Sequence, residues 1–233
     1  MISIENLVNQ YLEKENIKQK EEHSQYSGLI SASSLGQCYR RIFYTIQKIE
    51  PTNPPDERSL RVFACGNVFH KFVQDIVGQK ETIEVEKQFK DDVVSVRADI
   101  VTKDGVYELK SQHSKSFWYM DKELKANKKI TEFKPDNCLQ VGLCAMCFKK
   151  ENACLVYISK DDLCIRQFNL KTKDLEPLVT KEVDAIKNIL KVGNLPPPEP
   201  RLYGGNECIK KDKKGNVSWT CQFYDRCMTE REV

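Results

Sequence analysis

The sequence lacks any apolar run long enough to cross a bilayer, which takes about 20 consecutive apolar residues. Its first residues, with Glu5, Glu13, Lys14 and Glu15, do not follow the basic-then-apolar order of a secretion signal. It also has no internal repeat and no low-complexity stretch, which excludes solenoid and fibrous architectures. We therefore expect a globular, intracellular (cytoplasmic) protein with no membrane partner.

A strong excess of charge of one sign is missing too, because 37 Lys and Arg face 34 Asp and Glu, a formal net charge of +3. Such a balance neither proves nor excludes a nucleic-acid partner, since what matters is whether cations gather on one face. Two lysine clusters could neutralise phosphates, and ordinary solvated lysines explain each of them at least as well. The clusters are Lys122, Lys125, Lys128, Lys129 and Lys134, and Lys210, Lys211, Lys213 and Lys214.

Cysteine, in contrast, is abundant, with ten residues in a chain of 233. In an intracellular chain of this size, cysteines indicate metal ligands or buried thiols rather than disulfides. Four of them stand in polar surroundings near the chain ends, whereas the others lie in apolar runs. Four thiolates suit either a structural zinc ion or an iron-sulfur cluster, and spacing alone does not separate the two. The four are Cys38, Cys208, Cys221 and Cys227.

The chain length predicts one main core with an appendage. Hydrophobic periodicity predicts a mixed α/β fold in which helices and strands alternate. The expected elements are helices over 2–12, 34–46, 60–77 and 175–190, strands between 82 and 111, mostly helix over 115–150, and a hairpin over 155–170. Three prolines at 196–198 precede a loop-rich tail. The expected parts are an N-terminal extension (1–30), a core (31–195) and a cysteine-rich tail (196–233).

A hairpin turn is predicted at Asp104-Gly105, because this dipeptide stands between two β-rich runs and glycine tolerates the positive φ of such a turn. If Lys103 pairs with Val106, counting outward sets Asp99 opposite Lys110. Directly opposed residues of an antiparallel pair share one face of the sheet. The turn therefore predicts that polar residues of both strands converge.

The converging residues are Asp99, Glu108 and Lys110, while Ile100 and Leu109 point to the other face. A hard divalent cation could bind between the two acids, with the ammonium beside it. Phosphodiester cleavage needs a metal that lowers the pKa of an attacking water, and a nearby cation that stabilises the developing charge. The pattern alone is equally typical of a cross-strand ion pair between Asp99 and Lys110 with Glu108 solvated.

Arg97-Ala-Asp99, a short turn and Glu108-Leu-Lys110 resemble the signature of the PD-(D/E)XK nucleases. With the upstream segment Gly66-Asn-Val-Phe-His70, the resemblance narrows to the RecB-type members. It implies a restriction-endonuclease-like fold, with a mixed central sheet flanked by helices, and a metal-dependent deoxyribonuclease. It also implies that Lys110 is catalytic and that Mg2+ or Mn2+ binds to His70, Asp99, Glu108 and the Leu109 carbonyl. Without the resemblance, a histidine beside an apolar stripe is more often structural.

RecB-type nucleases also carry a glutamine on a helix after the catalytic strands, commonly as Gln-x-x-x-Tyr. The corresponding segment is Gln140-Val-Gly-Leu-Cys144, in which a cysteine replaces the tyrosine. The resemblance implies that Gln140 supports the active site, but it gives no role to Cys144. Cys144 and Cys147 lie on an apolar helix, where cysteines are typically small buried hydrophobes.

The segment Ser31-Ala-Ser-Ser-Leu35-Gly-Gln-Cys38-Tyr-Arg40-Arg-Ile-Phe-Tyr44 resembles the first ligand region of the iron-sulfur RecB-type nucleases. These include the CRISPR-associated adaptation exonucleases and AddB-like nuclease domains. Their tail motif is Cys-x2-Cys-x5-Cys, and Cys221 with Cys227 reproduces its second spacing. The first spacing departs from the motif, since Ile209–Thr220 separates Cys208 from Cys221, which we interpret as a lysine-rich insertion. The resemblance implies a 4Fe-4S cluster on Cys38, Cys208, Cys221 and Cys227 that joins the tail to the N-terminal helices; structural zinc is the alternative.

The resemblance further implies an exonuclease that acts on single-stranded DNA or free DNA ends. Many members of the family trim DNA for CRISPR spacer acquisition, which implies the CRISPR integrase complex as a partner. Phage recombination or DNA repair is the alternative pathway. Two alternatives from other classes are a non-catalytic iron-sulfur DNA-binding module and a regulator with a zinc site.

Overall fold

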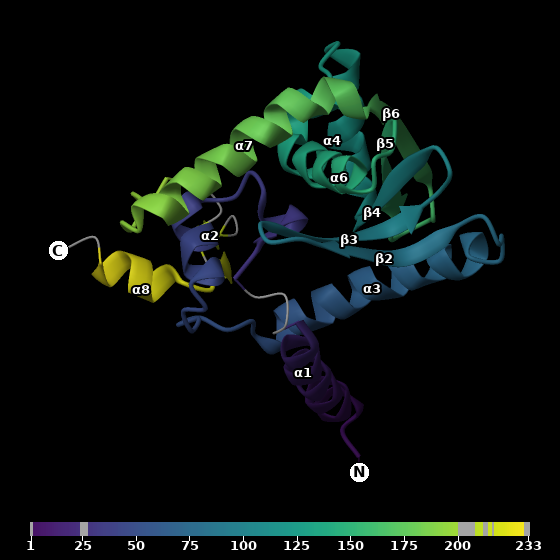
Figure 1. Cartoon of the computed structure of the whole chain (residues 1–233). Coiled ribbons are helices and arrows are strands. Elements are labelled where there is room, and N and C mark those ends of the chain that lie inside the picture. Colours follow the sequence, from purple (N-terminus) through teal and green to yellow (C-terminus); the bar gives the residue numbers. More distant parts are fainter. Residues whose placement is uncertain (1, 24–27, 200–207, 212–213, 216, 231–233) are drawn as a thin grey trace. The chain divides into compact units, whose positions relative to one another are not determined.

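The computed structural model describes residues 2–230 except 24–27, 200–207, 212–213 and 216 (Figure 1). The chain divides into two compact units. The first, which we call the sheet unit, comprises Ile30–Gly36 and Gly66–Ala185. The second, the cysteine unit, comprises Met1–Leu29, Gln37–Cys65 and Ile186–Val233. The three-part division expected from the sequence stays a prediction.

The sheet unit contains a six-stranded mixed sheet with the order β1-β3-β4-β5-β6, in which β2 also pairs with β3. β4 and β5 are parallel, so that a crossover must join them, and the helical segment between them provides it. The strands predicted between 82 and 111 and the hairpin predicted over 155–170 are confirmed. The strands are β1 (Ile30–Ser31), β2 (Glu84–Lys90), β3 (Val94–Val101), β4 (Gly105–Gln112), β5 (Asn152–Ser159) and β6 (Ile165–Lys171).

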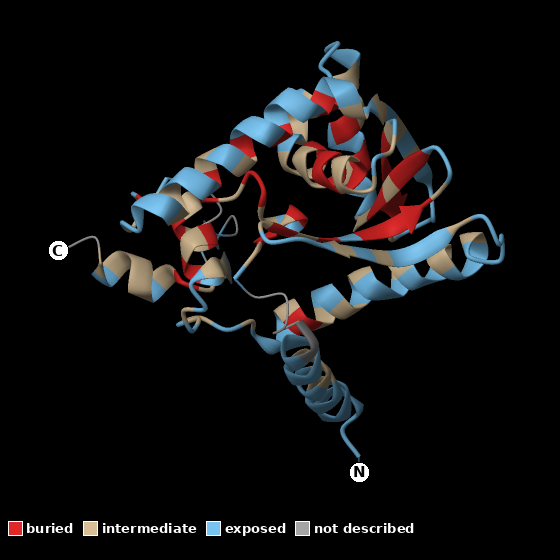
Figure 2. Cartoon of the chain, viewed as in Figure 1, coloured by how far each residue is buried: buried red, intermediate tan, exposed pale blue. Residues whose placement is uncertain are grey.

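Helices cover both faces of this sheet, and buried residues concentrate between the layers (Figures 1 and 2). On one face, Phe69 and Val73 of α3 (Glu57–Val77) pack against a core that contains Ile100 and Leu109. The other face contacts α6 (Pro135–Cys147). The remaining helices of the crossover are α4 (Ser114–Lys125) and α5 (Ile130–Phe133). The helical predictions over 60–77 and 115–150 are confirmed.

The last long helix, α7 (Thr172–Val192), packs on α6 at a glycine. A Cβ atom at Gly142 would lie 2.8 Å from Val179 and 3.2 Å from Leu175, so only glycine permits this approach. α7 ends at Gly193, which has a φ of 73°. This ending agrees with the prediction over 175–190, because glycine after the last turn is a common helix stop. None of the helices in the described part of the chain is long and apolar enough to span a membrane.

The predicted hairpin register is wrong by two residues. Val106 pairs with Val101, whereas the sequence predicted that it would pair with Lys103. Gly105 is not a turn residue but begins β4, where a Cβ atom would lie 3.1 Å from the Asn152 carbonyl oxygen. The glycine therefore serves close strand packing rather than a positive φ. Because the side-chain period of a strand is two, a shift of two residues leaves every side chain on its predicted face.

Two predictions near the N-terminus are also wrong. The first helix, α1 (Ile4–His23), runs far beyond the expected residue 12, because its polar second half is rich in Lys, Glu and Gln, which form helices well without an apolar face. The helix expected from Ser34 begins only at α2 (Tyr39–Ile46), with Cys38 as its N-cap. Gly36, whose φ is 79°, interrupts the helical pattern before it.

In the cysteine unit, the described residues of the tail form regular elements where the sequence indicated mostly loop. The tail contains the hairpin of β7 (Ile209–Lys211) and β8 (Val217–Thr220), and then α8 (Tyr224–Thr229). Within this unit, the tail packs on α2. The rings of Tyr44 and Phe223 lie 5.1 Å apart, and Arg40 Nε donates a 2.7 Å hydrogen bond to the Pro196 carbonyl. The described residues of the tail therefore contact α2 through an aromatic pair and a hydrogen bond to the chain before the tail hairpin.

Candidate active site

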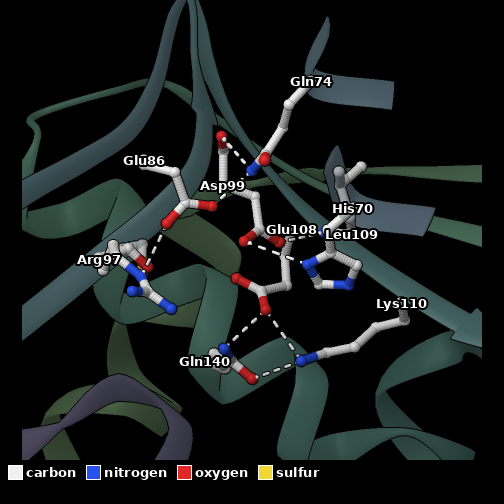
Figure 3. A network of polar contacts seen from close by, with 10 residues as sticks. His70, Gln74, Glu86, Arg97, Asp99, Glu108, Leu109, Lys110 and Gln140 are labelled. Carbon is white, nitrogen blue, oxygen red and sulfur yellow. Dashed lines mark hydrogen bonds and ion pairs between the residues drawn. The ribbon is translucent and has the colours of Figure 1, made fainter. Parts of the chain in front are cut away.

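Two acidic side chains lie next to each other on the face of the sheet that α6 covers (Figure 3). Asp99 comes from β3 and Glu108 from β4, and both are buried, with 8% and 3% of their surface exposed. Asp99 Oδ2 accepts a 2.7 Å hydrogen bond from the Leu109 backbone N–H. The structure thus brings the two predicted carboxylates together, as the strand pattern indicated.

Glu108 has one satisfied and one unsatisfied oxygen. Oε1 accepts hydrogen bonds from Lys110 Nζ at 2.8 Å and from Gln140 Nε2 at 2.6 Å. Oε2 is buried and has no hydrogen-bond partner among the described residues. Burial raises the pKa of Glu108 to about 7; Lys110 opposes this shift, and the Asp99 charge adds to it. The positive charge of Lys110 is therefore not enough to keep both Asp99 and Glu108 ionised at neutral pH.

Lys110 and Gln140 form a closed polar triangle with Glu108. Besides its bond to Glu108, Lys110 Nζ donates to Gln140 Oε1 at 2.8 Å. Burial acts to lower the pKa of Lys110, but the Glu108 charge and hydrogen bond raise it above its usual value. Lys110 therefore stays protonated. Gln140 reaches this position from α6, so the predicted supporting glutamine does lie at the site.

His70 lies on the other side of Asp99. Its Nδ1 is 3.6 Å from Asp99 Oδ1, longer than a hydrogen bond but within ion-pair distance. Burial lowers the pKa of His70, and the neighbouring Asp99 and Glu108 charges more than compensate, so that the net shift is upward. The histidine thus faces the carboxylates rather than the apolar core, which is where the family resemblance expected it.

A second polar network at the site was not predicted from the sequence. Glu86 of β2 accepts a hydrogen bond from Gln74 Nε2 at 2.5 Å and forms an ion pair with Arg97 Nε at 2.8 Å. Gln74 also donates to the Asp99 carbonyl at 3.3 Å, so the network supports the strand beneath the acid (Figure 3). Arg97 had one available signal, because it stands two residues before Asp99 and so shares its face. Nothing in the pattern marked Glu86, whose φ is 52°.

A divalent cation fits the chemistry of these donors. Hard cations such as Mg2+ and Mn2+ prefer carboxylate and carbonyl oxygens, and Glu108 Oε2 is a buried anionic oxygen without a donor. In the described part of the chain, however, no three His, Cys, Asp or Glu side chains are arranged so that they could hold a metal ion as they stand. The ligand set of His70, Asp99, Glu108 and the Leu109 carbonyl stays a prediction.

The four candidate cluster cysteines all belong to the cysteine unit. The backbone N–H of Cys221 donates a 2.8 Å hydrogen bond to the Cys208 carbonyl, and Cys227 Sγ lies 3.9 Å from a guanidinium nitrogen of Arg40. Burial raises the pKa of Cys221, and the charges of Cys38 and Cys227 add to the shift. None of the ten cysteines forms a disulfide. Cys38 and Cys227 lie near enough to Cys221 to affect its pKa, but no three of these cysteines in the described part of the chain are arranged to hold a metal ion as they stand, and the cluster stays a prediction.

Cys144 stands where the resembling motif has a tyrosine, and its Sγ contacts the Arg97 carbonyl at 4.0 Å, the limit for a hydrogen bond from sulfur. Cys144 is fully buried on α6, and burial raises the pKa of its thiol well above the usual value. Cys147 is half-buried on the same helix, and its pKa is raised to about 11 by burial. High thiol pKa values make both poor ligands and poor nucleophiles. Both therefore behave as the small hydrophobes that the sequence indicated.

No protein-family model matches the sequence, and no curated protein matches it. Among solved structures, the chain is similar to the crystal structure of SSO0001, with a TM-score of 0.54 and 19% identity over 83% of this chain and 88% of that one. Two further matches are LHK-Exo, an alkaline exonuclease from Laribacter hongkongensis (TM-score 0.49), and the same protein in complex with dAMP (TM-score 0.47). Each has 14% identity over 75% of this chain and 93% of that one. The match to SSO0001 shows a shared fold, a mixed sheet flanked by helices.

Proposed function

We propose that this chain is a metal-dependent nuclease that hydrolyses phosphodiester bonds in DNA. The observation that carries the proposal is the Glu108 carboxylate, buried beside Asp99 with one oxygen held by Lys110 and Gln140 and the other without a partner among the described residues. A buried anionic oxygen without a donor is costly, and its pKa rises in response. A bound divalent cation would remove that cost by giving the oxygen a positively charged partner.

The residues of the site divide the work. Asp99 and Glu108 would hold the cation, with His70 and the Leu109 carbonyl as further ligands. A bound Mg2+ or Mn2+ supplies a water of lowered pKa and neutralises charge on the phosphate. Lys110, already protonated and fixed by Glu108 and Gln140, would donate a hydrogen bond to that water or to a phosphate oxygen. Gln140 acts through Lys110 and is a positioning residue.

DNA as the substrate rests on the resemblance of Arg97-Ala-Asp99 and Glu108-Leu-Lys110 to the PD-(D/E)XK signature. The same resemblance supports a finer assignment, an exonuclease that acts on single-stranded or free ends and trims DNA for CRISPR spacer acquisition. That assignment predicts binding to a CRISPR integrase, measurable by co-purification from a co-expressing strain. A role in phage recombination or DNA repair predicts no such binding.

We also propose that Cys38, Cys208, Cys221 and Cys227 hold a 4Fe-4S cluster. Support comes from the gathering of these cysteines in one unit and from the part-buried state of the three in the tail. Protein purified without oxygen should absorb in the violet region and contain iron, and Cys221→Ser should lose both signals. Zinc in place of iron, without the absorption band, would support the zinc alternative instead.

The nuclease proposal is tested by digestion of end-labelled single-stranded DNA with Mn2+, Mg2+ or a chelator. We expect metal-dependent shortening by the wild-type chain and loss of it in Lys110→Ala. Lys181→Ala, a change at an exposed lysine on α7, is the matched control and should digest normally. Protein with its cluster intact that binds DNA but never digests it would overturn the nuclease assignment in favour of the binding-module alternative.

A further inference from the structure

One face of α4 exposes two large aromatic side chains between two lysines. Lys115, Trp118, Tyr119 and Lys122 follow the three-and-four spacing that places residues side by side on a helix. Trp118 is 60% exposed and Tyr119 51% exposed. We call these four residues the aromatic face. The helix packs into the sheet unit through its opposite side, where Phe117 and Met120 are buried, so the aromatic face is not needed for packing.

The two rings stand edge to face, with centroids 4.9 Å apart and planes at 74°. This geometry leaves much of each flat ring surface open. Lys115 Nζ lies 6.0 Å from the Tyr119 centroid, which is at the limit of a cation–π contact. Exposed aromatic pairs of this kind commonly mark interaction surfaces, because folding alone gains nothing from leaving them in water.

The charges around the aromatic face favour an anionic ligand. Within the described residues, neither Lys115 nor Lys122 has a carboxylate at ion-pair distance. The acidic residues of the same helix are already neutralised elsewhere, since Asp121 pairs with Arg166 and Glu123 pairs with Lys128. The face is therefore positively charged, and its two cations are free to bind an anion.

The aromatic face lies close to the candidate active site along the chain. β4, which carries Glu108 and Lys110, ends at Gln112, and α4 begins at Ser114. A strand rises about 3.3 Å per residue and a helix about 1.5 Å, so Trp118 lies within about 20 Å of Lys110.

We propose that the aromatic face binds unpaired bases of single-stranded DNA by stacking, while Lys115 and Lys122 contact the adjacent phosphates. Exposed rings flanked by lysines suit a single strand, because its bases can stack on the rings while neighbouring phosphates contact the lysines. A protein partner fits less well, because lysine is depleted from the cores of protein interfaces. The inference rests on the proposed function for DNA as the ligand, and it adds a binding surface on α4 for the unpaired strand outside the candidate active site.

The test compares two labelled oligomers of equal length, an oligothymidylate and an abasic strand that keeps the phosphates but has no bases. Binding to the full chain is measured by fluorescence anisotropy in chelator, so that no metal-dependent digestion occurs. The wild type should bind the thymidylate about 5- to 150-fold more tightly than the abasic strand. Trp118→Ala should lose most of this preference, because only Tyr119 of the two proposed stacking rings remains, and Trp118→Phe should restore most of it. Leu178→Ala, at a half-exposed apolar residue on α7, is the control and should resemble the wild type.

Equal binding of both oligomers by the wild type, or an unchanged preference in Trp118→Ala, would overturn the proposal. Its failure is distinct from failure of the nuclease. If the chain digests DNA in Mn2+ but binds both oligomers equally, the nuclease proposal stands and the stacking proposal is wrong. If the chain binds the thymidylate more tightly, and this preference depends on Trp118, but it never digests DNA, the stacking proposal stands and the nuclease proposal is wrong.

Discussion

The Asp99 carboxylate accepts a hydrogen bond from the backbone N–H of Leu109 across the hairpin, at 2.7 Å. The pairing of β3 with β4 ends at Ile100 and Tyr107. The Leu109 N–H lies beyond this point, so the Asp99 side chain accepts the hydrogen bond that a backbone carbonyl would accept in a longer ladder. The acid is thereby fixed beside the residue that separates Glu108 from Lys110. Its position depends on its own role as a backbone acceptor.

This double role of Asp99 predicts different outcomes for two substitutions. Asp99→Asn keeps an oxygen that can accept from Leu109 but loses the charge, so we expect loss of metal-dependent digestion with little loss of stability. Asp99→Ala also leaves a buried N–H without an acceptor, which costs about 1–3 kcal/mol of unfolding free energy. Digestion assays and urea unfolding of both variants measure the two effects. Normal digestion by Asp99→Ala would exclude Asp99 from the active site.

The raised pKa of Glu108 predicts an unusual dependence of stability on pH. The usual pKa of 4.5 in the unfolded chain is below the folded value of about 7, so the folded state binds more protons between these values. The Glu108 contribution to stability is therefore favourable at low pH and is lost as the pH rises from 4.5 through about 7. In chelator, wild-type stability should fall over this window relative to Glu108→Gln, as measured by urea midpoints.

Added Mn2+ supplies the missing positive charge, so it should stabilise the wild type at pH 7 and above and have little effect on Glu108→Gln. Parallel pH curves for the two proteins in chelator would contradict the assigned burial of the Glu108 charge.

The contacts of Gln140 predict a positioning role. Gln140→Ala removes one partner from Lys110 and one from Glu108, and loss of such supporting partners typically lowers metal affinity or activity about 10- to 100-fold. Titration of digestion rate against Mn2+ concentration should show a weaker metal response in this variant. Gln167→Ala, at an exposed glutamine of β6, serves as the control, and an equal loss there would point to a general effect on folding.

Two helical glycines predict opposite effects of alanine on stability. Gly142→Ala would place a Cβ atom 2.8 Å from Val179, so we expect a loss of about 1–3 kcal/mol from overpacking between α6 and α7. At Gly66 in α3, the nearest contact of such an atom would be Ser111 Oγ at 3.7 Å. Gly66→Ala should therefore gain about 0.5–1 kcal/mol from helix propensity. Thermal and urea unfolding compare the two, and equal signs would contradict the packing described for α6.

The sequence predicted which side chains meet at the site better than it predicted their pairing. The face shared by Asp99, Glu108 and Lys110 depends only on the period of two, which a register error of two residues preserves. The predicted register was wrong because Asp104-Gly105 was interpreted as the turn. Gly105 instead begins a strand, where a larger residue would crowd the Asn152 backbone. Local patterns do not reveal such a contact between distant segments.

Other features could not be predicted from the sequence pattern for similar reasons. The network of Gln74, Glu86 and Arg97 joins three elements, and its acid adopts a backbone conformation that sequence alone does not mark. The length of α1 was missed because its second half carries no apolar stripe. Gln140, in contrast, was found through the family resemblance, and periodicity alone would not have selected it.

The hairpin between Cys208 and Cys221 turns a long separation along the chain into contact in space. Ile209 pairs with Thr220, and the backbones of the two cysteines are joined by one hydrogen bond. Paired strands hold the two ends of a hairpin together whatever the length of the loop that joins them. Each doubling of loop length costs only about 0.6 kcal/mol. A change in the number of residues between the two paired strands should therefore alter the distance between Cys208 and Cys221 little.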